Sequence, residues 1–180
     1  MNCKKIMRGI LGVTAAAMLF CGCGRKETGL DDKLTDYKVS GSDSISLEYM
    51  NSDDHKFVTI KKDDDKFDEV QKKLNDVFDN AGTKETGFKG EKLDEDFQGP
   101  AVSYTTKTSD GDYSIITVDW NTMKGYATLY KTTLTSEELN ACYSDSGSLN
   151  HLGSREELGT YYFEASDTDE LNKVFKEYCE

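Results

Sequence analysis

The chain has 180 residues, with 22 Lys and Arg against 34 Asp and Glu and a formal net charge of −12. Its mean hydropathy is −0.67, but an aromatic content of 11% is too high for a disordered chain. This length suits one domain with a single core. The acidic balance argues against a nucleic-acid partner, because phosphate contacts require an excess of Lys and Arg on one face.

Residues 1–22 predict a signal peptide. Lys4, Lys5 and Arg8 form a basic start, and an uncharged stretch follows over residues 9–20. This stretch is too short to cross the ~30 Å hydrocarbon core of a membrane, for which a helix needs about 20 residues. A basic start before a short apolar stretch is instead typical of a secretory signal.

The sequence Leu-Phe-Cys-Gly-Cys-Gly at residues 19–24 resembles the lipobox of bacterial lipoproteins. In that family a small residue precedes a Cys that is lipidated and becomes the new N-terminus, and Gly22 before Cys23 matches this pattern. Phe20 departs from it, because the family prefers Leu at that position. Cys21 is the rival acceptor, but Phe20 directly before it is disfavoured in the family. An ordinary secretory signal with incidental cysteines is the alternative.

The resemblance covers the leader only and leaves the family of the domain open. It implies a protein held by fatty acyl chains on the extracytoplasmic face of the cell membrane. At least two such chains would be present, and two make a durable anchor where one binds only marginally.

Residues 23–43 are polar and charged, and they predict a flexible tether before a single domain at residues 44–180. Within the domain, Ile45, Leu47 and Tyr49 alternate with polar residues and predict a half-buried strand. Residues 57–60, three of which are β-branched, predict a second strand, and the polar cluster between the two indicates a hairpin.

One apolar stripe predicts a helix over residues 67–78. We expect Asp63–Asp65 to cap its start and Gly82 to end it, with a loop over residues 83–99. The stripe consists of Phe67, Val70, Leu74, Val77 and Phe78.

Three strands joined by turns are predicted at residues 101–106, 113–120 and 126–131. The middle one should be central, because apolar residues share one of its faces; they are Ile116, Val118 and Trp120.

Thr135 and Glu138 fit a capping box that opens a short helix through Tyr143. A last strand is predicted at residues 160–165, and Asp167 is the expected cap of a closing helix. That helix presents Leu171, Val174, Phe175 and Tyr178 on one side. The resulting order, β-β-α-β-β-β-α-β-α, predicts an α+β domain with a mainly antiparallel sheet and helices packed on one face.

The sequence offers little catalytic material. His55 lies beside the first hairpin turn and His151 in a loop, and both are expected to be exposed. No metalloprotease, nucleophile-elbow, Walker or dinucleotide motif occurs, and the acidic clusters do not match a calcium loop. We therefore predict a protein that is not an enzyme and carries no cofactor or metal. A hydrolase or transferase built on carboxylates is the alternative, and two buried acids near His55 or His151 would favour it.

Two cysteines remain in the domain, Cys142 and Cys179. In an exported protein they could form a disulfide. They could equally be two buried thiols that act as small hydrophobic side chains. The sequence leaves both alternatives open.

Tyrosines offer a candidate binding face for a glycan or peptide on the side of the sheet away from the helices. Ordinary half-buried cross-strand pairs are the alternative interpretation. The tyrosines concerned are Tyr104, Tyr113, Tyr126 and Tyr130.

Taken together, these features predict a lipid-anchored, extracytoplasmic and non-catalytic module that binds a protein or peptide partner at the cell envelope. A small solute-binding or glycan-binding protein is a further alternative, although the domain is small for a two-lobed binding cleft.

Overall fold

The computed structural model describes residues 29–50, 55–79, 100–121, 125–145, 149, 154–163 and 165–179. The predicted signal peptide, Cys21, Cys23, Gly82, the predicted loop at 83–99 and His151 lie outside these residues. The strands are β1 (Ser44–Met50), β2 (His55–Lys61), β3 (Ala101–Lys107), β4 (Tyr113–Asn121), β5 (Tyr126–Leu134) and β6 (Glu156–Tyr162). The helices are α1 (Leu30–Asp36), α2 (Phe67–Phe78), α3 (Ser136–Asp145) and α4 (Ala165–Cys179), with a 3₁₀ turn, η1, at Val39–Gly41.

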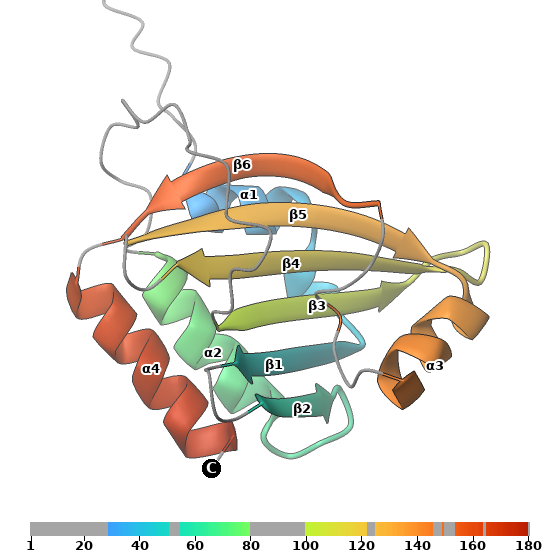
Figure 1. Ribbon diagram of the computed structural model, residues 1–180, viewed down its shortest axis with the longest axis horizontal. Coiled ribbons are helices and arrows are strands. Elements are labelled where there is room, and N and C mark those ends of the chain that lie inside the picture. The colour runs from blue at the N-terminus through green and yellow to red at the C-terminus, as the bar shows by residue number, and fades with distance from the viewer. Residues whose placement is uncertain are drawn as a thin grey trace, which may run out of the picture.

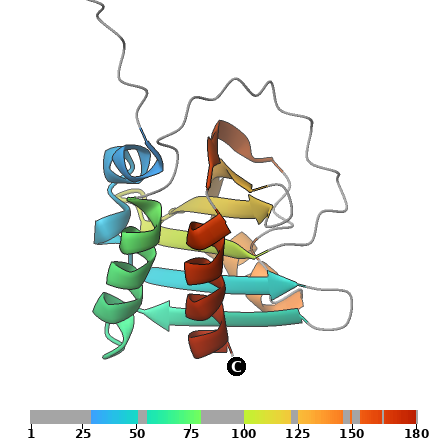
Figure 2. The same cartoon turned by 90° about the vertical axis from the view of Figure 1, so that its left-hand side faces the viewer.

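The six strands form one sheet in the order β2-β1-β3-β4-β5-β6, and all neighbours are antiparallel. The predicted α+β class and the predicted order of elements from β1 onward are confirmed. The strand that contains Trp120 is central, as predicted, since β4 lies between β3 and β5. Helices α1, α2 and α4 lie on one side of the sheet (Figures 1 and 2).

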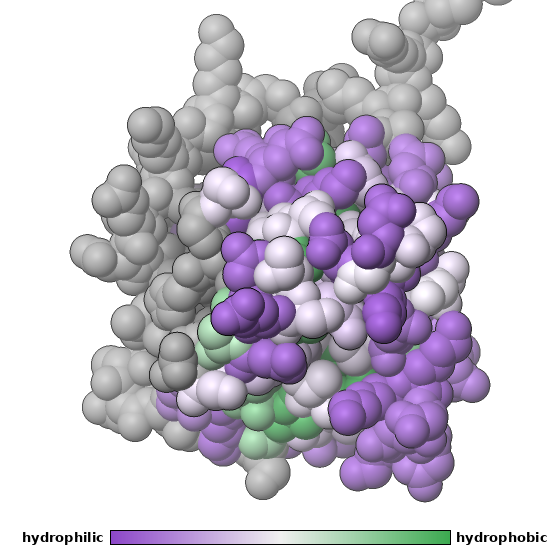
Figure 3. Space-filling model, turned by 90° about the vertical axis from the view of Figure 1, so that its right-hand side faces the viewer, coloured by the Kyte–Doolittle hydropathy of each residue, from purple (hydrophilic) through white to green (hydrophobic). Residues whose placement is uncertain are grey.

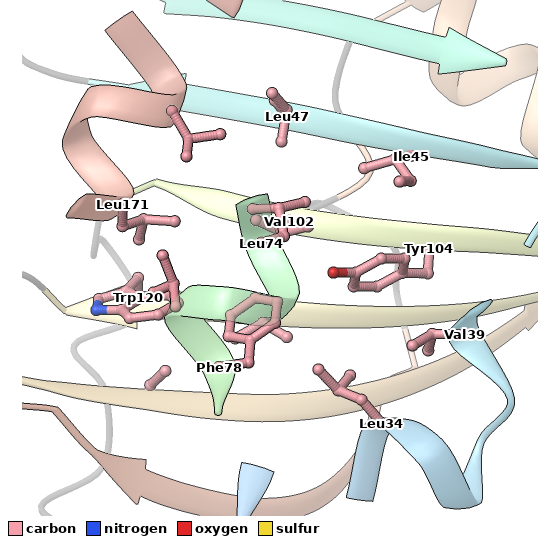
Figure 4. Packing of buried hydrophobic residues seen from close by; sticks show 14 of the residues in the cluster. Leu34, Val39, Ile45, Leu47, Leu74, Phe78, Val102, Tyr104, Trp120 and Leu171 are labelled. Carbon is pink, nitrogen blue, oxygen red and sulfur yellow. The ribbon is translucent and has the colours of Figure 1, made fainter. Parts of the chain in front are cut away.

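The side of the sheet under these helices, which we call the apolar face, holds the main core (Figure 4). Trp120 is fully buried there, with its ring 5.6 Å from that of Phe78 on α2 and 3.8 Å from that of Phe163. Side chains alternate between the two faces of a strand with a period of two, so every second strand residue points into this core. The strand residues of this face include Ile45, Leu47, Val102, Tyr104, Ile116, Val118, Trp120, Ala127 and Leu129.

The N-terminal segment of the described chain belongs to this core. Leu30, Leu34 and Val39 have relative exposures of 0%, 1% and 5%, and they pack against the main cluster. The predicted flexible tether over residues 23–43 is therefore wrong for its second half. Three apolar residues in a charged segment are too few to show a helical pattern in the sequence. Contacts with the sheet and α2 stabilise the segment instead.

Of the helix N-terminal caps predicted from the sequence, one is confirmed and two are wrong. The backbone N–H of Thr135 donates to Glu138 Oε2 over 2.8 Å, and that of Glu138 donates to Thr135 Oγ1 over 3.2 Å, which is the predicted capping box. At α2 no side chain caps the helix; Asp64 Oδ1 accepts instead from the backbone N–H of Lys66 in the turn before it. Asp167, the other expected cap, lies inside the first turn of α4.

The strand predicted at residues 160–165 begins earlier, at Glu156, and ends at Tyr162. A register shift opposite Leu129 and Tyr130 interrupts its pairing with β5. The bulge breaks the period of two, and this explains why alternation did not reveal the first half of the strand.

Helix α3 packs on the opposite side of the sheet from the other three helices, so the prediction that the helices pack on one face is wrong for α3. Its Leu139 joins Ile115 and Leu134 in a second, smaller cluster. Cys142 packs against that cluster, whereas Cys179 packs against the main core. Neither cysteine belongs to a disulfide. Of the two alternatives left open by the sequence, the structure therefore agrees with two free thiols. Burial raises the pKa of Cys179 to about 11.

None of the helices in the described ranges is long and apolar enough to cross a membrane.

The packing of α1 can be tested by comparing Leu34→Ala with Thr35→Ala. Leu34 is buried and Thr35 is exposed on the same helix. We expect Leu34→Ala to lower the free energy of unfolding by about 2–5 kcal/mol, because it leaves a cavity, and Thr35→Ala to change it by at most about 0.5 kcal/mol. Chemical denaturation measures both values. Equal and small effects would show that this segment is a tether.

Candidate functional site

The face of the sheet opposite the main core is lined by polar side chains, and we call it the polar face. It follows from the alternation that builds the core, because every second residue of the same strands points the other way. Most of these side chains are buried. The polar face includes Ser46, Glu48, Ser103, Thr105, Thr117, Asp119, Asn121, Thr128, Tyr130 and Thr132.

Some hydroxyl groups of this face are hydrogen-bonded to each other in cross-strand pairs. Ser103 Oγ and Thr117 Oγ1 lie 2.9 Å apart on neighbouring strands. Ser46 pairs in the same way with Thr59 over 3.0 Å. Such pairs are ordinary structural contacts, since buried polar groups are nearly always hydrogen-bonded.

Two carboxylates occupy one row of the polar face. Glu48 on β1 lies opposite Ala101 on β3, and Ala101 lies opposite Asp119 on β4. The Cα atoms of the two acids are therefore two strand spacings, or about 10 Å, apart. The short side chain of Ala101 lies between them. We call Glu48, Ala101 and Asp119 the acid row.

Glu48 is paired with His55, the first residue of β2. His55 Nε2 and Glu48 Oε1 lie 3.0 Å apart, and the Glu48 side chain is 3% exposed against 36% for His55. The second oxygen, Oε2, is buried and has no hydrogen-bond partner. A buried carboxylate oxygen without a donor is costly, so Glu48 is incompletely satisfied.

Asp119 is paired with Arg155, which directly precedes β6. Arg155 Nη1 donates to Asp119 Oδ2 over 2.7 Å, and its guanidinium lies 4.2 Å from the ring centre of Tyr130. Oδ1 of Asp119 is buried without a partner. Burial raises the pKa of Asp119 above its usual value, and the nearby charge of Glu48 acts in the same direction, while Arg155 opposes both. Burial, and then the charge of Asp119, raise the pKa of Tyr130 as well.

The predicted tyrosine face has to be corrected. Tyr104 lies in the main core with a relative exposure of 1%, because the register with β1 and β4 places it opposite Ile45 and Ile116. The remaining three are on the polar face but do not form one wall. Tyr113 packs at the α3 cluster, Tyr126 is buried beside Tyr162, and Tyr130 contacts Arg155.

Glu48, Asp119 and Arg155 were missed by the sequence reasoning. A charged residue inside an otherwise apolar strand, such as Asp119 between Val118 and Trp120, is the signal that could have found one of them. His55 was placed correctly beside the hairpin turn, but its contact with Glu48 needs the register of β1 and β2.

The surface at the α3 end of the molecule is mainly hydrophilic. Figure 3 shows this end, with hydrophobic areas that are small and separate. A large exposed apolar patch, which marks many protein interfaces, is not visible over the described residues of this side. Within the described ranges, no three His, Cys, Asp or Glu side chains gather as a metal site.

Comparison with known proteins gives no match: no family model, no curated protein and no solved structure is similar to this chain. The function of the polar face has therefore to be inferred from its own chemistry.

The raised pKa of Asp119 predicts a pH-dependent effect of Asp119→Asn. The folded state binds this proton more tightly than the unfolded chain, whose value is near 3.8. Ionisation of Asp119 therefore has no effect on stability below that value, and it destabilises the fold as the pH rises through the raised pKa. The free energy of unfolding of Asp119→Asn relative to the wild type should therefore increase as the pH rises above about 4.

Urea denaturation at a series of pH values measures this difference. Asp110→Asn, in the exposed turn between β3 and β4, is the matched control and should show no such trend. A difference for Asp119→Asn that is constant or falls with pH would contradict the inference.

Proposed function

We propose that the protein is a lipid-anchored, extracytoplasmic binding module that contacts its partner through the polar face of the sheet. The observation that carries this proposal is the acid row, in which Glu48 and Asp119 each keep one buried oxygen without a partner. The hydroxyl pairs Ser46–Thr59 and Ser103–Thr117 are complete, whereas Thr105 Oγ1 on the same face is also buried without a partner. Incomplete polar groups beside complete ones are what a site for a polar ligand requires before the ligand is bound.

The proposed anchor is inferred from the leader, and the fold sets how far from the membrane the anchor would hold the domain. Only residues 24–29 separate Cys23 from the start of α1. Six extended residues span at most about 20 Å, so α1 would lie close to the bilayer. Since α1 and the C-terminus lie at opposite ends of the domain (Figures 1 and 2), β2 and the end of α4 would point away from the membrane. The sheet would then stand across the membrane plane, with its polar face turned sideways.

The anchor predicts that Cys23→Ser releases the protein from the membrane. The variant lacks the thiol that would carry the lipid, whereas Cys21→Ser keeps it and should remain bound. Fractionation of bacterial cells that process lipoproteins, with immunodetection of the full chain, measures the outcome. Retention of Cys23→Ser in the membrane fraction, or release of Cys21→Ser alone, would contradict the assignment of Cys23.

The binding role predicts contacts from the polar face in the intact envelope. A photoreactive benzoylphenylalanine at Tyr130 should give a discrete cross-linked product in living cells, because Tyr130 is half-exposed beside Arg155. The same residue at Lys176, exposed on α4 on the other side of the sheet, should not. Equal products from both positions, or none from Tyr130, would count against the polar face as the binding surface.

A second candidate function, a carboxylate-based hydrolase, is favoured by one observation. Glu48 and Asp119 are two buried acids on one row, His55 contacts the first of them, and the pKa of Asp119 is raised. A carboxyl whose pKa is raised can act as a general acid, with a second carboxylate as base. The ion pair with Arg155 opposes this role for Asp119, since it favours the charged form.

This second candidate predicts that turnover depends on both acids. Chromogenic glycosides and esters incubated with the wild type, Glu48→Gln and Asp119→Asn provide the measurement. As a hydrolase, the wild type should be active, and each variant should lose about 100-fold or more. Absence of wild-type turnover, or equal turnover in all three proteins, would leave binding as the role of the acid row.

A further inference from the structure

Strand β2 forms one edge of the sheet, with β1 as its neighbour on the inner side (Figure 1). The backbone N–H of Lys62 donates to the carbonyl of Asp43 over 2.9 Å, and this bond fixes the phase of the ladder between β2 and β1. Opposed residues of an antiparallel ladder alternate between exchanging hydrogen bonds and pointing away from each other. The N–H and C=O groups of Phe57 and Thr59 therefore point outward, and they have no hydrogen-bond partner within the described ranges.

The edge at β2 is regular, whereas the other edge of the sheet, β6, is interrupted. All seven residues of β2 pair with β1 in one register, and the strand contains neither Gly nor Pro. Strand β6 contains Gly159 and has a register shift against β5. Bulges of this kind protect an edge from pairing with another chain, and a regular edge lacks that protection. Of the two edges, β2 is therefore the one that is suited to accept a further strand.

Half-buried apolar side chains flank the open edge on both sides of the sheet. Phe57 lies on the polar face, opposite Glu48, with its ring 5.8 Å from that of Tyr143 on α3. Val58 lies on the apolar face and packs against the main core, as does Cys179 at the end of α4. A strand added to β2 would place alternate side chains beside these two groups. Peptides that bind by strand addition use this combination, because backbone bonds give affinity and neighbouring side chains give specificity.

Charge restricts the sequence of an added strand. Lys61, at the end of β2, is exposed, and none of the ion pairs within the described ranges includes it. The aspartates at 63–65 lie in the turn beyond the strand. A lysine on an edge opposes pairing with another basic strand, whereas opposite charges across two strands attract each other. An acidic residue is therefore favoured opposite Lys61.

The proposed anchor argues against a second copy of this chain as the added strand. A copy that extended the sheet through its own β6 would lie six strand spacings, or about 29 Å, further from the bilayer. The segment between Cys23 and α1 spans at most about 20 Å, so that copy could not be anchored in the same membrane. A copy that paired through its own β2 would be inverted and would need a facing membrane. A partner from the aqueous phase meets neither obstacle.

We propose that β2 binds an extended segment of a partner protein as an additional antiparallel strand, with an acidic residue opposite Lys61. The backbone of the partner would bond to Phe57 and Thr59. Because the side chains of these two residues lie on the polar face, the added strand would also extend that face. The inference adds a contact surface to the proposed binding role, and it rests on the proposed anchor for the choice of a partner over a second copy.

The test is a titration of the full chain that carries Cys23→Ser, followed by NMR of the backbone amides of Phe57 and Thr59. The probe is acetyl-Glu-Val-Thr-Val-Tyr-Thr-Glu-amide, whose first Glu lies opposite Lys61 in antiparallel pairing. We expect saturable shifts at these amides and none at Thr160 on β6. A probe methylated on the amide nitrogens of its first Thr and of its Tyr keeps every side chain but lacks the donors for strand pairing, so it should not bind.

Thr59→Pro and Thr59→Ala are matched variants of the edge. Both remove the hydroxyl that pairs with Ser46, but only Pro removes the outward N–H, and an edge strand tolerates Pro at such a position. Affinity should fall about tenfold in Thr59→Pro and stay close to the wild-type value in Thr59→Ala. The methylated probe needs no variant, so the proposal stays testable if Thr59→Pro does not fold.

The preference for an acidic residue is tested by exchanging charges. A probe with Lys in place of its first Glu should bind the wild type about two- to fivefold more weakly. In Lys61→Glu the order of the two probes should reverse, because the charge on the strand is inverted while the backbone edge is unchanged. The same order in both proteins would overturn the acidic specificity.

No saturable shift with the acidic probe, equal binding of the methylated probe, or unchanged affinity in folded Thr59→Pro would overturn strand addition. Shifts of the same amides that depend on protein concentration alone, with dimers in sedimentation, would overturn the partner and assign the edge to a second copy. The titration contains no membrane, so a negative result leaves the anchor standing. Retention of Cys23→Ser in the membrane fraction would overturn the anchor and leave the titration result unchanged.

Discussion

The packing of helices on the apolar face of the sheet is the constraint on which the other features depend. Trp120 lies at its centre, between Phe78 of α2 and Phe163 after β6. Because strand side chains alternate, burying this set of residues commits the other set to the opposite face, and a register slip of one residue would exchange them. The register that puts Trp120 in the core therefore also puts its neighbour Asp119 on the polar face.

The buried polar groups of the polar face differ in how completely they are hydrogen-bonded. Pairs such as Ser103 with Thr117 bond across neighbouring strands and need nothing further. Glu48 and Asp119 each have one cationic partner and one buried oxygen without a donor. A buried polar network that is only partly satisfied is destabilising by itself, and proteins retain such groups where a function depends on them. This contrast separates the acid row from the hydroxyl pairs around it.

The folding of α1 onto the core links the proposed anchor to the orientation of the domain. With Leu30 and Leu34 buried, the segment between Cys23 and the domain is short, and the protein could not reach far from the bilayer. A flexible tether over residues 23–43 would have let the domain rotate freely. The short connection instead would keep β6 and α1 near the membrane and the polar face turned sideways.

Local patterns in the sequence were sufficient for most of the secondary structure. The stripe of α2, the alternation in β1 and β4 and the capping box at Thr135 all arise from contacts within a few residues, so they can be predicted without the rest of the fold. Helix α1 could not, because its two buried apolar residues, Leu30 and Leu34, are stabilised by contacts with the rest of the core.

The candidate site depended almost entirely on tertiary structure. Tyr104 was predicted for the wrong face, since only its pairing with β1 and β4 shows that it points toward the core. The acidity of the chain was evident from composition, but Glu48 and Asp119 are far apart in the sequence. They share a row only because β3 lies between β1 and β4 with Ala101 in register. Strand order and register are long-range contacts, and a periodicity within one strand carries no information about them.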